Sequence, residues 1–444
     1  MKLIFTMSAV ELVNAIQNKQ IGIEELTKEY IERIKKLDGV DGLNAVSELN
    51  DNAVAQAKKM DSAKNERKGA IFGLPVLIKD NIDVSGLHTT AGSLALSDNI
   101  AKKDAHIVMN LRRNGAVILG KTNMTEFANY TSGSMPGGYS SRGGQVKNAY
   151  SRAKSPGGSS SGSAVAMSAG LCSAAIGTDT SFSVIGCVTD NGVTGLKPTH
   201  GSLSSDGIIP IAKTLDSAGP ITRDLGDAIL VYSSMRDEAL PPIEAAPPEK
   251  IRLAINIFNR NQVSEAQLGR YEVVLSALKA NRVRVTKVNH AYTKYQRDIM
   301  RCEFRHGLEE YLSNSMAKRR TLKEIVDYYE TYPDQMMIYG NSLLRGALYN
   351  ASGKLDDKTY IEALTERKKL RNQIIEDIGE YDACLMTGPT NIMHFTGLPS
   401  VALRLCMADD GTPRGMILYG ADERRLFAAA LTVERYCSPI INVC

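Results

Sequence analysis

Residues 155–170, SPGGSSSGSAVAMSAG, join two glycines and a run of serines to a segment of small, mostly apolar residues. The segment 163–170 predicts a helix of very small side chains, and the apolar residues 174–176 predict a buried strand. A helix that leads directly into a buried strand is typical of folds in which helices cover a sheet. The stretch therefore indicates an α/β fold with an ordered, glycine-rich loop close to the sheet.

Short apolar segments on both sides of this stretch continue the pattern. An N-terminal helix is expected to begin at Ser8, and a second carries Leu26, Tyr30 and Ile34 on one face. Helices are also expected from Asn123, over 264–279 and over 422–436, and the turn Asp410-Gly411 indicates a hairpin. Strands are expected at 75–78, 116–119, 174–176, 252–257, 283–288, 401–407 and 416–419. The predicted fold class is α/β: a single large fold with a mixed twisted β-sheet covered by helices on both faces.

Composition changes along the chain suggest four regions. A helical segment over 1–65 is expected to pack on a core over 66–240 that carries the chemistry. The proline-rich residues 240–250 mark the start of a variable, mainly helical segment over 241–380 that we expect to shape the substrate pocket. Residues 381–444 are expected to return to the core sheet and close with a helix.

The bulk composition excludes several classes of protein. The net charge is +4, and short basic runs such as Lys318-Arg319-Arg320 come with no groove-reading motif, so no nucleic-acid partner is expected. The seven cysteines form no C-x-x-C pair and several lie in apolar runs, which indicates reduced, buried thiols in a cytoplasmic protein. No signal peptide and no long apolar run is found, so no membrane partner is expected.

Two familiar site patterns do not fit the sequence. Gly158-Ser159-Ser160-Ser161-Gly162 satisfies G-x-S-x-G, but a loop and not a strand precedes it, and no downstream histidine has a distinctive acid partner. The six histidines show no metal-ligand spacing, so neither a metal nor another cofactor is expected.

The candidate base that the sequence still offers is Lys79, at the end of a predicted strand. A buried lysine can act as a base because desolvation lowers its pKa by up to ~3–5 units. Taken alone, however, the position of Lys79 is more typical of a surface lysine at a strand end or of half of an ion pair with Asp80.

Several motifs, in a fixed order along most of the chain, resemble the amidase signature family. They are GLPVLIKDNIDVSGLHTTAGS over 73–93, GKTNM over 120–124, GGSSSGSA over 157–164, GTDT over 177–180, GLKPT over 195–199, DSAGP over 216–220 and GLPS over 397–400. The resemblance implies that Lys79 is the catalytic lysine and that Ser159 is the serine whose preceding peptide bond is cis. It implies that Ser183 is the nucleophile, twenty-four residues after Ser159. It also implies an oxyanion hole formed by main-chain N–H groups of Thr180, Ser181, Phe182 and Ser183.

The chain departs from the family pattern in the loop that carries the nucleophile. The family has two glycines before the nucleophile, and this chain has Ser181 and Phe182. Either the loop has a different shape here, or Phe182 adopts an ordinary backbone conformation and lines the pocket, and we expect the second. Candidate pocket residues are Asn123, Met124, Gly133, Phe182 and Ile185.

The resemblance implies a metal-independent amidase that acts through an acyl-enzyme. The stretch 138–146 and the lack of an arginine after Ser183 favour a stand-alone hydrolase of peptide-like or acyl amides, similar to bacterial peptide amidases. Two alternatives stay open: the glutaminase subunit of a tRNA-dependent amidotransferase, and a catalytically impaired scaffold protein. The expected partner is a small-molecule or peptide amide, and the expected assembly is a monomer or homodimer.

Overall fold

The computed structural model describes residues 4–62 and 69–437. Helices α1 (Ala9–Gln17) and α2 (Ile23–Leu37) precede the first strand of the sheet, and α3 (Ala53–Ser62) follows that strand. Ser8 caps α1 as expected, because its hydroxyl accepts the N–H of Glu11 while the Glu11 side chain accepts the N–H of Ser8. The predicted face of α2 is also confirmed, since Leu26, Tyr30 and Ile34 are all buried.

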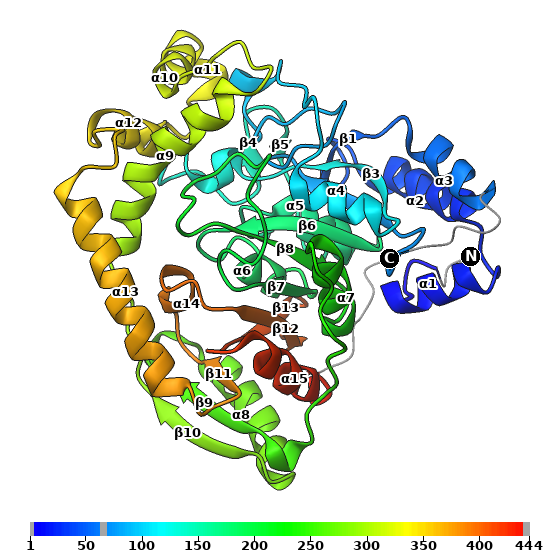
Figure 1. Cartoon of the computed structure of the whole chain (residues 1–444), viewed down its shortest axis with the longest axis vertical. Coiled ribbons are helices and arrows are strands. Elements are labelled where there is room, and N and C mark those ends of the chain that lie inside the picture. Colours follow the sequence, from blue (N-terminus) through cyan, green and yellow to red (C-terminus); the bar gives the residue numbers. More distant parts are fainter. Residues whose placement is uncertain (1–3, 63–68, 438–444) are drawn as a thin grey trace.

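A single eleven-stranded sheet runs through the molecule, in the order β1-β3-β2-β6-β8-β7-β12-β13-β11-β9-β10 (Figure 1). Its strands are β1 (Val46–Leu49), β2 (Pro75–Lys79), β3 (Val117–Thr122), β6 (Ala174–Asp179), β7 (Thr194–Lys197), β8 (Ser217–Thr222), β9 (Arg252–Asn256), β10 (Arg284–Val288), β11 (Ala383–Met386), β12 (Ser400–Met407) and β13 (Pro413–Tyr419). Strand β2 pairs in parallel with β3 and β6, while β12 and β13 form the expected antiparallel hairpin. The sheet is therefore mixed, as predicted.

Helices cover both faces of this sheet, as the contacts of strand β7 show. A Cβ on Gly195 would lie 3.0 Å from Val188 of α6 (Ile185–Thr189), so this residue faces that helix. The next residue, Leu196, packs in a cluster with Leu225 of α7 (Leu225–Met235) and Phe427 of α15 (Glu423–Glu434). Successive strand residues point to opposite faces, so α6 and the pair α7 and α15 lie on opposite sides. Helices α4 (His106–Arg113), α5 (Ser161–Ser168) and α8 (Glu265–Ala280) complete the cover.

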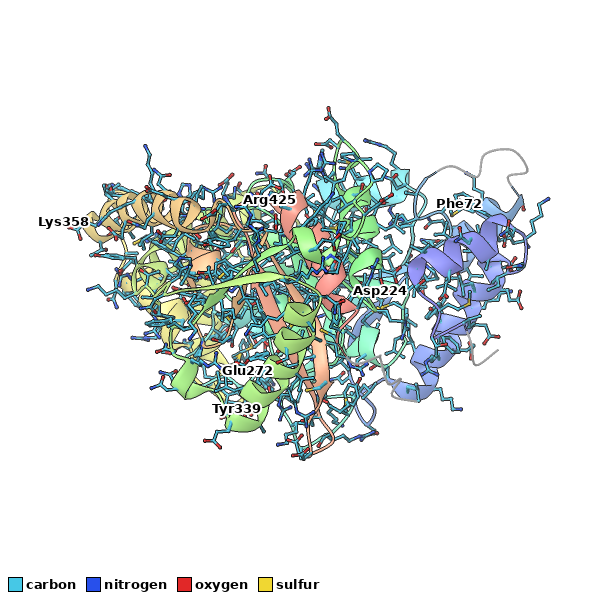
Figure 2. All side chains as sticks on the ribbon, turned by 90° about the horizontal axis from the view of Figure 1, so that it is seen from below. Phe72, Asp224, Glu272, Tyr339, Lys358 and Arg425 are labelled. Atoms are coloured by element: carbon cyan, nitrogen blue, oxygen red, sulfur yellow. The ribbon has the colours of Figure 1, made fainter. Side chains whose placement is uncertain are left out.

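A second helical layer lies along one side of the sheet (Figure 1). It comprises α9 (Tyr295–Ser313), α10 (Leu322–Thr331), α11 (Pro333–Met336), α12 (Ser342–Tyr349) and α13 (Lys358–Ile378). Its buried side chains, Phe304 and Leu308 among them, form one cluster with Met124 and Phe127 of the core. In Figure 2 Lys358, at the start of α13, and Phe72, beside the N-terminal helices, lie on opposite sides of the molecule. The predicted boundaries near 240 and 380 stay a prediction.

The predicted helix from Asn123 is wrong. The structure has only a short turn, η2 (Glu126–Asn129), in which Phe127 and Ala128 have φ of 46° and 56°. The backbone groups here bond to distant residues instead of forming helical bonds: the N–H of Phe127 donates to Ala91 O over 2.8 Å, and that of Thr125 to Ser159 O over 3.1 Å. Long-range bonds thus replace a local helix that the side-chain pattern favoured.

The glycine-rich stretch 131–162 is ordered, as expected. It contains the small hairpin β4 (Tyr139–Ser140) and β5 (Gly144–Gln145), and it ends at α5. Gly138 has φ of +85° and its N–H donates to Thr125 Oγ1 over 2.7 Å. The loop is therefore fastened to the segment that follows β3. Cys172, Cys187, Cys302, Cys384 and Cys406 are buried free thiols, which agrees with the predicted reduced state.

Candidate active site

Lys79 ends strand β2 inside the protein. The strand is buried along its whole length, and the Lys79 side chain is fully covered. Its Nζ donates to Ser159 Oγ over 2.8 Å, to Ser160 Oγ over 3.0 Å and to Thr178 Oγ1 over 2.9 Å. Strand β6, which carries Thr178, pairs with β2, and the two serines precede α5. The sheet register thus brings the lysine to the serine loop.

Burial lowers the pKa of Lys79 to about 7, while nearby acidic groups such as Asp179 and Asp216 oppose this shift. The suggested ion pair with Asp80 is not formed. The Asp80 carboxylate accepts the N–H of Gly92 over 3.0 Å and lies 3.9 Å from Lys121 Nζ. In the described parts of the chain, Lys79 forms no ion pair that would stabilise its charged form. With a pKa of about 7, the Lys79 amine is neutral in a large fraction of the molecules near pH 7.

Ser159 lies in the tight connection before α5, and its side chain is fully buried. The peptide bond between Gly158 and Ser159 is cis. Ser160 Oγ accepts from Lys79 and donates to Thr178 O over 3.1 Å. No histidine within residues 4–62 and 69–437 bonds to Ser160, so the serine–histidine pair that a G-x-S-x-G nucleophile elbow requires is not formed at this position.

Ser183 lies in the loop over 180–183 that joins β6 to α6. The N–H of Ser160 donates to the Ser183 carbonyl over 3.2 Å, so this loop packs directly against the serine loop. Ser183 is 5% exposed, and its hydroxyl forms no hydrogen bond with any residue that the structure describes. The structure therefore brings the neighbourhoods of all three residues together: Lys79, Ser159 and Ser183.

Asp179 precedes the loop over 180–183, which we call the nucleophile loop, and binds the residues that follow it. Its Oδ2 accepts the N–H of Val184 over 2.7 Å and that of Ile185 over 3.0 Å. Burial alone would raise the pKa of this carboxyl, but the neighbouring His394 and the Val184 N–H lower it to about 2. Asp179 therefore stays charged and holds the chain on the far side of Ser183.

The main-chain N–H groups of residues 180–183 are unused. None of the four donates a hydrogen bond within the described residues, although the surrounding backbone is extensively bonded. A cluster of free N–H groups next to a hydroxyl is the arrangement that stabilises an oxyanion. These groups belong to Thr180, Ser181, Phe182 and Ser183, the four residues expected from the resemblance.

The expectation that Phe182 adopts an ordinary backbone conformation is wrong, because its φ is +66°. The left-handed region costs a bulky residue about 1–3 kcal/mol. Two contacts hold it there: its carbonyl accepts the N–H of Gly186 over 3.0 Å, and its ring packs edge-on against His394 with centroids 4.3 Å apart. A Cβ on Gly186 would lie 2.8 Å from Phe182 Cβ, so a glycine at 186 makes room for the phenylalanine.

The other candidate pocket residues differ in exposure. Met124 and Ile185 are fully buried, and Asn123 donates from Nδ2 to Asn44 O over 2.9 Å. Gly133 is exposed. Among the candidates at the loop itself, the partly exposed side chain belongs to Phe182. The role of these residues as a pocket stays a prediction.

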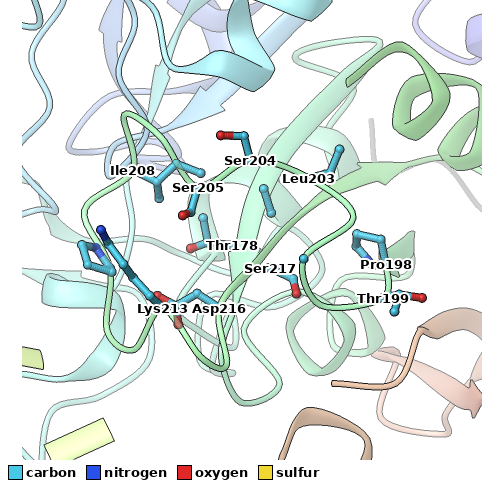
Figure 3. Close-up of a pocket in the computed structure, with 13 residues that line it drawn as sticks. Thr178, Pro198, Thr199, Leu203, Ser204, Ser205, Ile208, Lys213, Asp216 and Ser217 are labelled. Atoms are coloured by element: carbon cyan, nitrogen blue, oxygen red, sulfur yellow. The ribbon is translucent and has the colours of Figure 1, made fainter. Parts of the chain in front are cut away.

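A small cavity lies beside Thr178, the residue that contacts Lys79. Its volume is about 20 Å³, and Figure 3 shows Lys213, Asp216 and Ser217 around it together with the loop that follows β7. This is room for about one water molecule and far too little for an amide substrate. Asp216 links the cavity to the nucleophile loop, since its Oδ1 accepts the Thr180 hydroxyl over 2.5 Å. Burial raises the pKa of Asp216 to about 7.

His394 is the neighbour of the site that the sequence did not indicate. It lies in the short helix α14 (Ile392–Phe395), and its Nδ1 is 3.0 Å from Asp179 Oδ1, with both side chains fully buried. The two residues are far apart in the sequence, so no spacing rule links them. The one local signal is the position of His394 just before the stretch GLPS over 397–400.

Comparison with known proteins identifies the family to which this arrangement belongs. The family model named Amidase matches residues 25–394. The chain belongs to the amidase family. Over 95% of its length it is 29% identical to a probable amidase of Arabidopsis thaliana, covering 88% of that protein. It is also 30% identical to a glutamyl-tRNA(Gln) amidotransferase subunit of Lysinibacillus sphaericus, covering 97% of this chain and 96% of that protein.

Solved structures of amidases have the same fold. The peptide amidase of Stenotrophomonas maltophilia superposes with a TM-score of 0.89 at 29% identity, covering 98% of each chain. An amidase family protein of Bacillus anthracis gives a TM-score of 0.91 at 28% identity, covering 99% of this chain and 92% of that one. The chain is therefore an amide-hydrolysing enzyme with the amidase signature fold.

The amidase offers neither a metal centre nor a membrane-spanning helix in its described residues. No group of three or more His, Cys, Asp or Glu side chains within 4–62 and 69–437 is placed to hold a metal ion. In the same residues, no helix is both long enough and apolar enough to cross a membrane.

Proposed function

We propose that the enzyme hydrolyses a linear C–N amide bond in a peptide-like or acyl amide, through an acyl-enzyme on Ser183. Lys79 acts as the base and Ser159 relays the proton. The observation that carries this proposal is the 2.8 Å contact between the buried Lys79 amine and Ser159 Oγ, next to a loop that presents Ser183. Activation of a hydroxyl by an adjacent base is the general requirement for a serine nucleophile.

Acylation begins with Lys79 in its neutral form. The amine takes the proton of the Ser159 hydroxyl, Ser159 takes the proton of Ser183, and Ser183 Oγ bonds to the amide carbon. The carbonyl oxygen becomes an oxyanion, which the free N–H groups of residues 180–183 stabilise. When the C–N bond breaks, the proton held by Lys79 returns through Ser159 to the leaving nitrogen, and the acyl group stays on Ser183.

Deacylation repeats these transfers with water as the nucleophile. Water gives a proton through Ser159 to Lys79, its oxygen bonds to the acyl carbon, and the proton returns to Ser183 Oγ as the ester bond breaks. The products are a carboxylic acid and an amine or ammonia. Because Lys79 accepts and then returns the proton in both halves, this mechanism requires no metal or cofactor.

The preference for peptide-like amides is supported by the similarity to a solved peptide amidase over 98% of both chains. The amidotransferase subunit is the second candidate, supported by the matching protein of L. sphaericus. The residue two positions after Ser183 is Ile185, which is apolar and fully buried. It cannot hold a glutamine carboxylate, and this favours the stand-alone hydrolase. A cytoplasmic location is part of the proposal, supported by the buried free thiols.

The test is a screen of primary amides, peptide amides, N-acyl amines and glutamine against wild type and Ser183→Ala. We expect hydrolysis by wild type and a loss of at least ~10³-fold in Ser183→Ala. A fluorophosphonate should label Ser183 in wild type, located by peptide mapping. Full activity in Ser183→Ala would exclude the mechanism, and the absence of both labelling and hydrolysis would favour the scaffold alternative. Activity on glutamine that requires a tRNA-binding partner would favour the amidotransferase.

A further inference from the structure

The nucleophile loop poses a mechanical problem. If the N–H groups of residues 180–183 are reserved for the oxyanion, they cannot anchor the loop to the protein. The loop must be held through its carbonyl groups and side chains instead. Two of its carbonyls are bound by the backbone nearby: Phe182 O accepts from Gly186 N–H and Ser183 O from Ser160 N–H. The Thr180 carbonyl, at the start of the loop, is bound from elsewhere.

Gln296 binds that carbonyl. It lies in the first turn of α9, is 3% exposed, and donates from Nε2 to Thr180 O over 2.9 Å. Asn391 fixes the orientation of the Gln296 amide, because its Nδ2 donates to Gln296 Oε1 over 2.6 Å. Asn391 is fixed in turn by Thr293, whose N–H donates to Asn391 Oδ1 over 2.8 Å. With its oxygen end occupied, the Gln296 amide can present only its N–H end to the loop.

His394 holds the loop from a second side. Asn391 directly precedes α14, so the helix that bears His394 also orients Gln296. The imidazole lies 3.0 Å from Asp179, whose other oxygen binds the two N–H groups after Ser183. The same ring packs edge-on against Phe182. The His394 imidazole therefore contacts both the Asp179 carboxylate, which binds the end of the loop, and the Phe182 ring, whose backbone is in the left-handed region.

We propose that Gln296 and His394 are positioning residues for amide hydrolysis, which together fix residues 180–183 so that the N–H groups and the Ser183 hydroxyl meet the substrate carbonyl. The inference rests on the proposed function. It assigns a catalytic task to α9 and α14, two elements far from the motifs that carry Lys79, Ser159 and Ser183. A displacement of about 1 Å at a reacting group costs ~10²-fold in rate, so the loss of either contact should slow acylation and leave substrate affinity nearly unchanged.

Gln296→Leu tests the first contact. We expect kcat and the rate constant for fluorophosphonate labelling of Ser183 to fall roughly 10–100-fold, with KM within about threefold of wild type. The matched control is Gln56→Leu. Gln56 also donates from Nε2 to a backbone carbonyl, that of Ala116 over 3.2 Å, and its Oε1 also accepts a bond, from Arg112. The control should change thermal stability without changing kcat.

His394→Leu and His394→Asn test the second contact. The leucine removes the group that faces Asp179, whereas the asparagine keeps an N–H donor close to the position of Nδ1. We expect a loss of kcat in His394→Leu and substantial recovery in His394→Asn. The control is His290→Leu, which breaks another contact between a buried histidine and an aspartate: His290 Nε2 lies 3.4 Å from Oδ2 of the exposed Asp377, beside the opposite end of the sheet. It should lower stability and leave kcat intact.

All rates are measured below the melting temperature of each variant and divided by the folded fraction, so that unfolding cannot imitate the effect. Unchanged kcat and labelling rates in Gln296→Leu and His394→Leu would overturn the proposal, as would a rise in KM with constant kcat, which indicates substrate contact. These outcomes differ from a failure of the proposed function. In that case wild type itself would not be labelled at Ser183, whatever residues stand at 296 and 394.

Discussion

The pH dependence of the reaction tests the base directly. If neutral Lys79 starts the reaction, activity must fall as the pH drops through its pKa, which burial lowers to about 7. The sign follows from the charge: below this pKa the amine binds a proton and can no longer accept one from Ser159. At pH 5, two units lower, about one amine in 100 is neutral, so kcat/KM should be ~100-fold below its plateau. An ordinary lysine, with a pKa near ~10.4, would place the same fall three units higher.

The assay is the steady-state rate of hydrolysis of an uncharged primary amide between pH 5 and pH 9, with kcat/KM plotted on a logarithmic scale. An uncharged substrate matters because its own titration then cannot shape the curve. The slope should be one decade per pH unit below about 7 and zero above it. Folding at each pH is checked by circular dichroism, so that acid unfolding does not enter the rates.

A second group near the site titrates over the same range and needs a control. Burial raises the pKa of Asp216 to about 7, and this carboxylate accepts the hydroxyl of Thr180 in the nucleophile loop. Asp216→Asn is uncharged at every pH, so any remaining acid limb in this variant belongs to another group. We expect the limb to persist, with its midpoint moved to lower pH because the Asp216 charge no longer raises the pKa of Lys79. A flat profile from pH 5 to pH 7 in wild type, or loss of the limb in Asp216→Asn, would refute the assignment to Lys79.

Further predictions follow from other contacts of the site. Ser159→Ala should reduce kcat by at least ~10²-fold with little change in folding, since it removes the proton relay, and near-normal turnover would exclude that role. Gly186→Ala should lower the free energy of unfolding by about 1–3 kcal/mol because its Cβ would lie 2.8 Å from Phe182 Cβ, and the effect should shrink in a Phe182→Gly background, as urea titration can show. Gly269→Ala is the matched control: no atom lies within 4 Å of its added Cβ inside helix α8, so it should stabilise by about 0.5–1 kcal/mol. Dialysis against EDTA should leave kcat unchanged, and a loss restored by a divalent metal would contradict the proposed chemistry.

Features that short-range chemistry determines could be predicted from the sequence. The Ser8 cap, the buried strand that ends at Lys79 and the small-residue helix α5 each depend on residues close together in the chain, and all three are present. The helix expected at Asn123 fails because its backbone bonds to Ala91 and Ser159, partners that no local pattern reveals.

The same distinction between local and long-range features applies to the residues of the site. The contact between Lys79 and Ser159 joins two well-marked motifs, so the resemblance was enough to anticipate both residues. The contacts of Asp179 with His394 and of Thr180 with Gln296 join the loop to segments without motifs. These pairs lie more than a hundred residues apart, and only the sheet order, which places β12 beside β7, brings α14 back to the nucleophile loop.

The resemblance implies a glycine where this chain has Phe182, and the contacts of Phe182 explain how the loop tolerates the larger residue. A left-handed phenylalanine costs about 1–3 kcal/mol, a large part of the ~5–15 kcal/mol that stabilises a typical protein. The ring contact with His394 and the space left by Gly186 offset that cost.

Glycine would adopt the same φ without strain, but it would also leave the loop free to adopt many other conformations. A phenylalanine whose ring and carbonyl are both held restricts the loop to one shape. Because Phe182 is also partly exposed and directly precedes Ser183, we propose that it adds an aromatic surface to the substrate pocket. On that proposal, the rigidity of the nucleophile loop and the selection of the substrate depend on the same side chain.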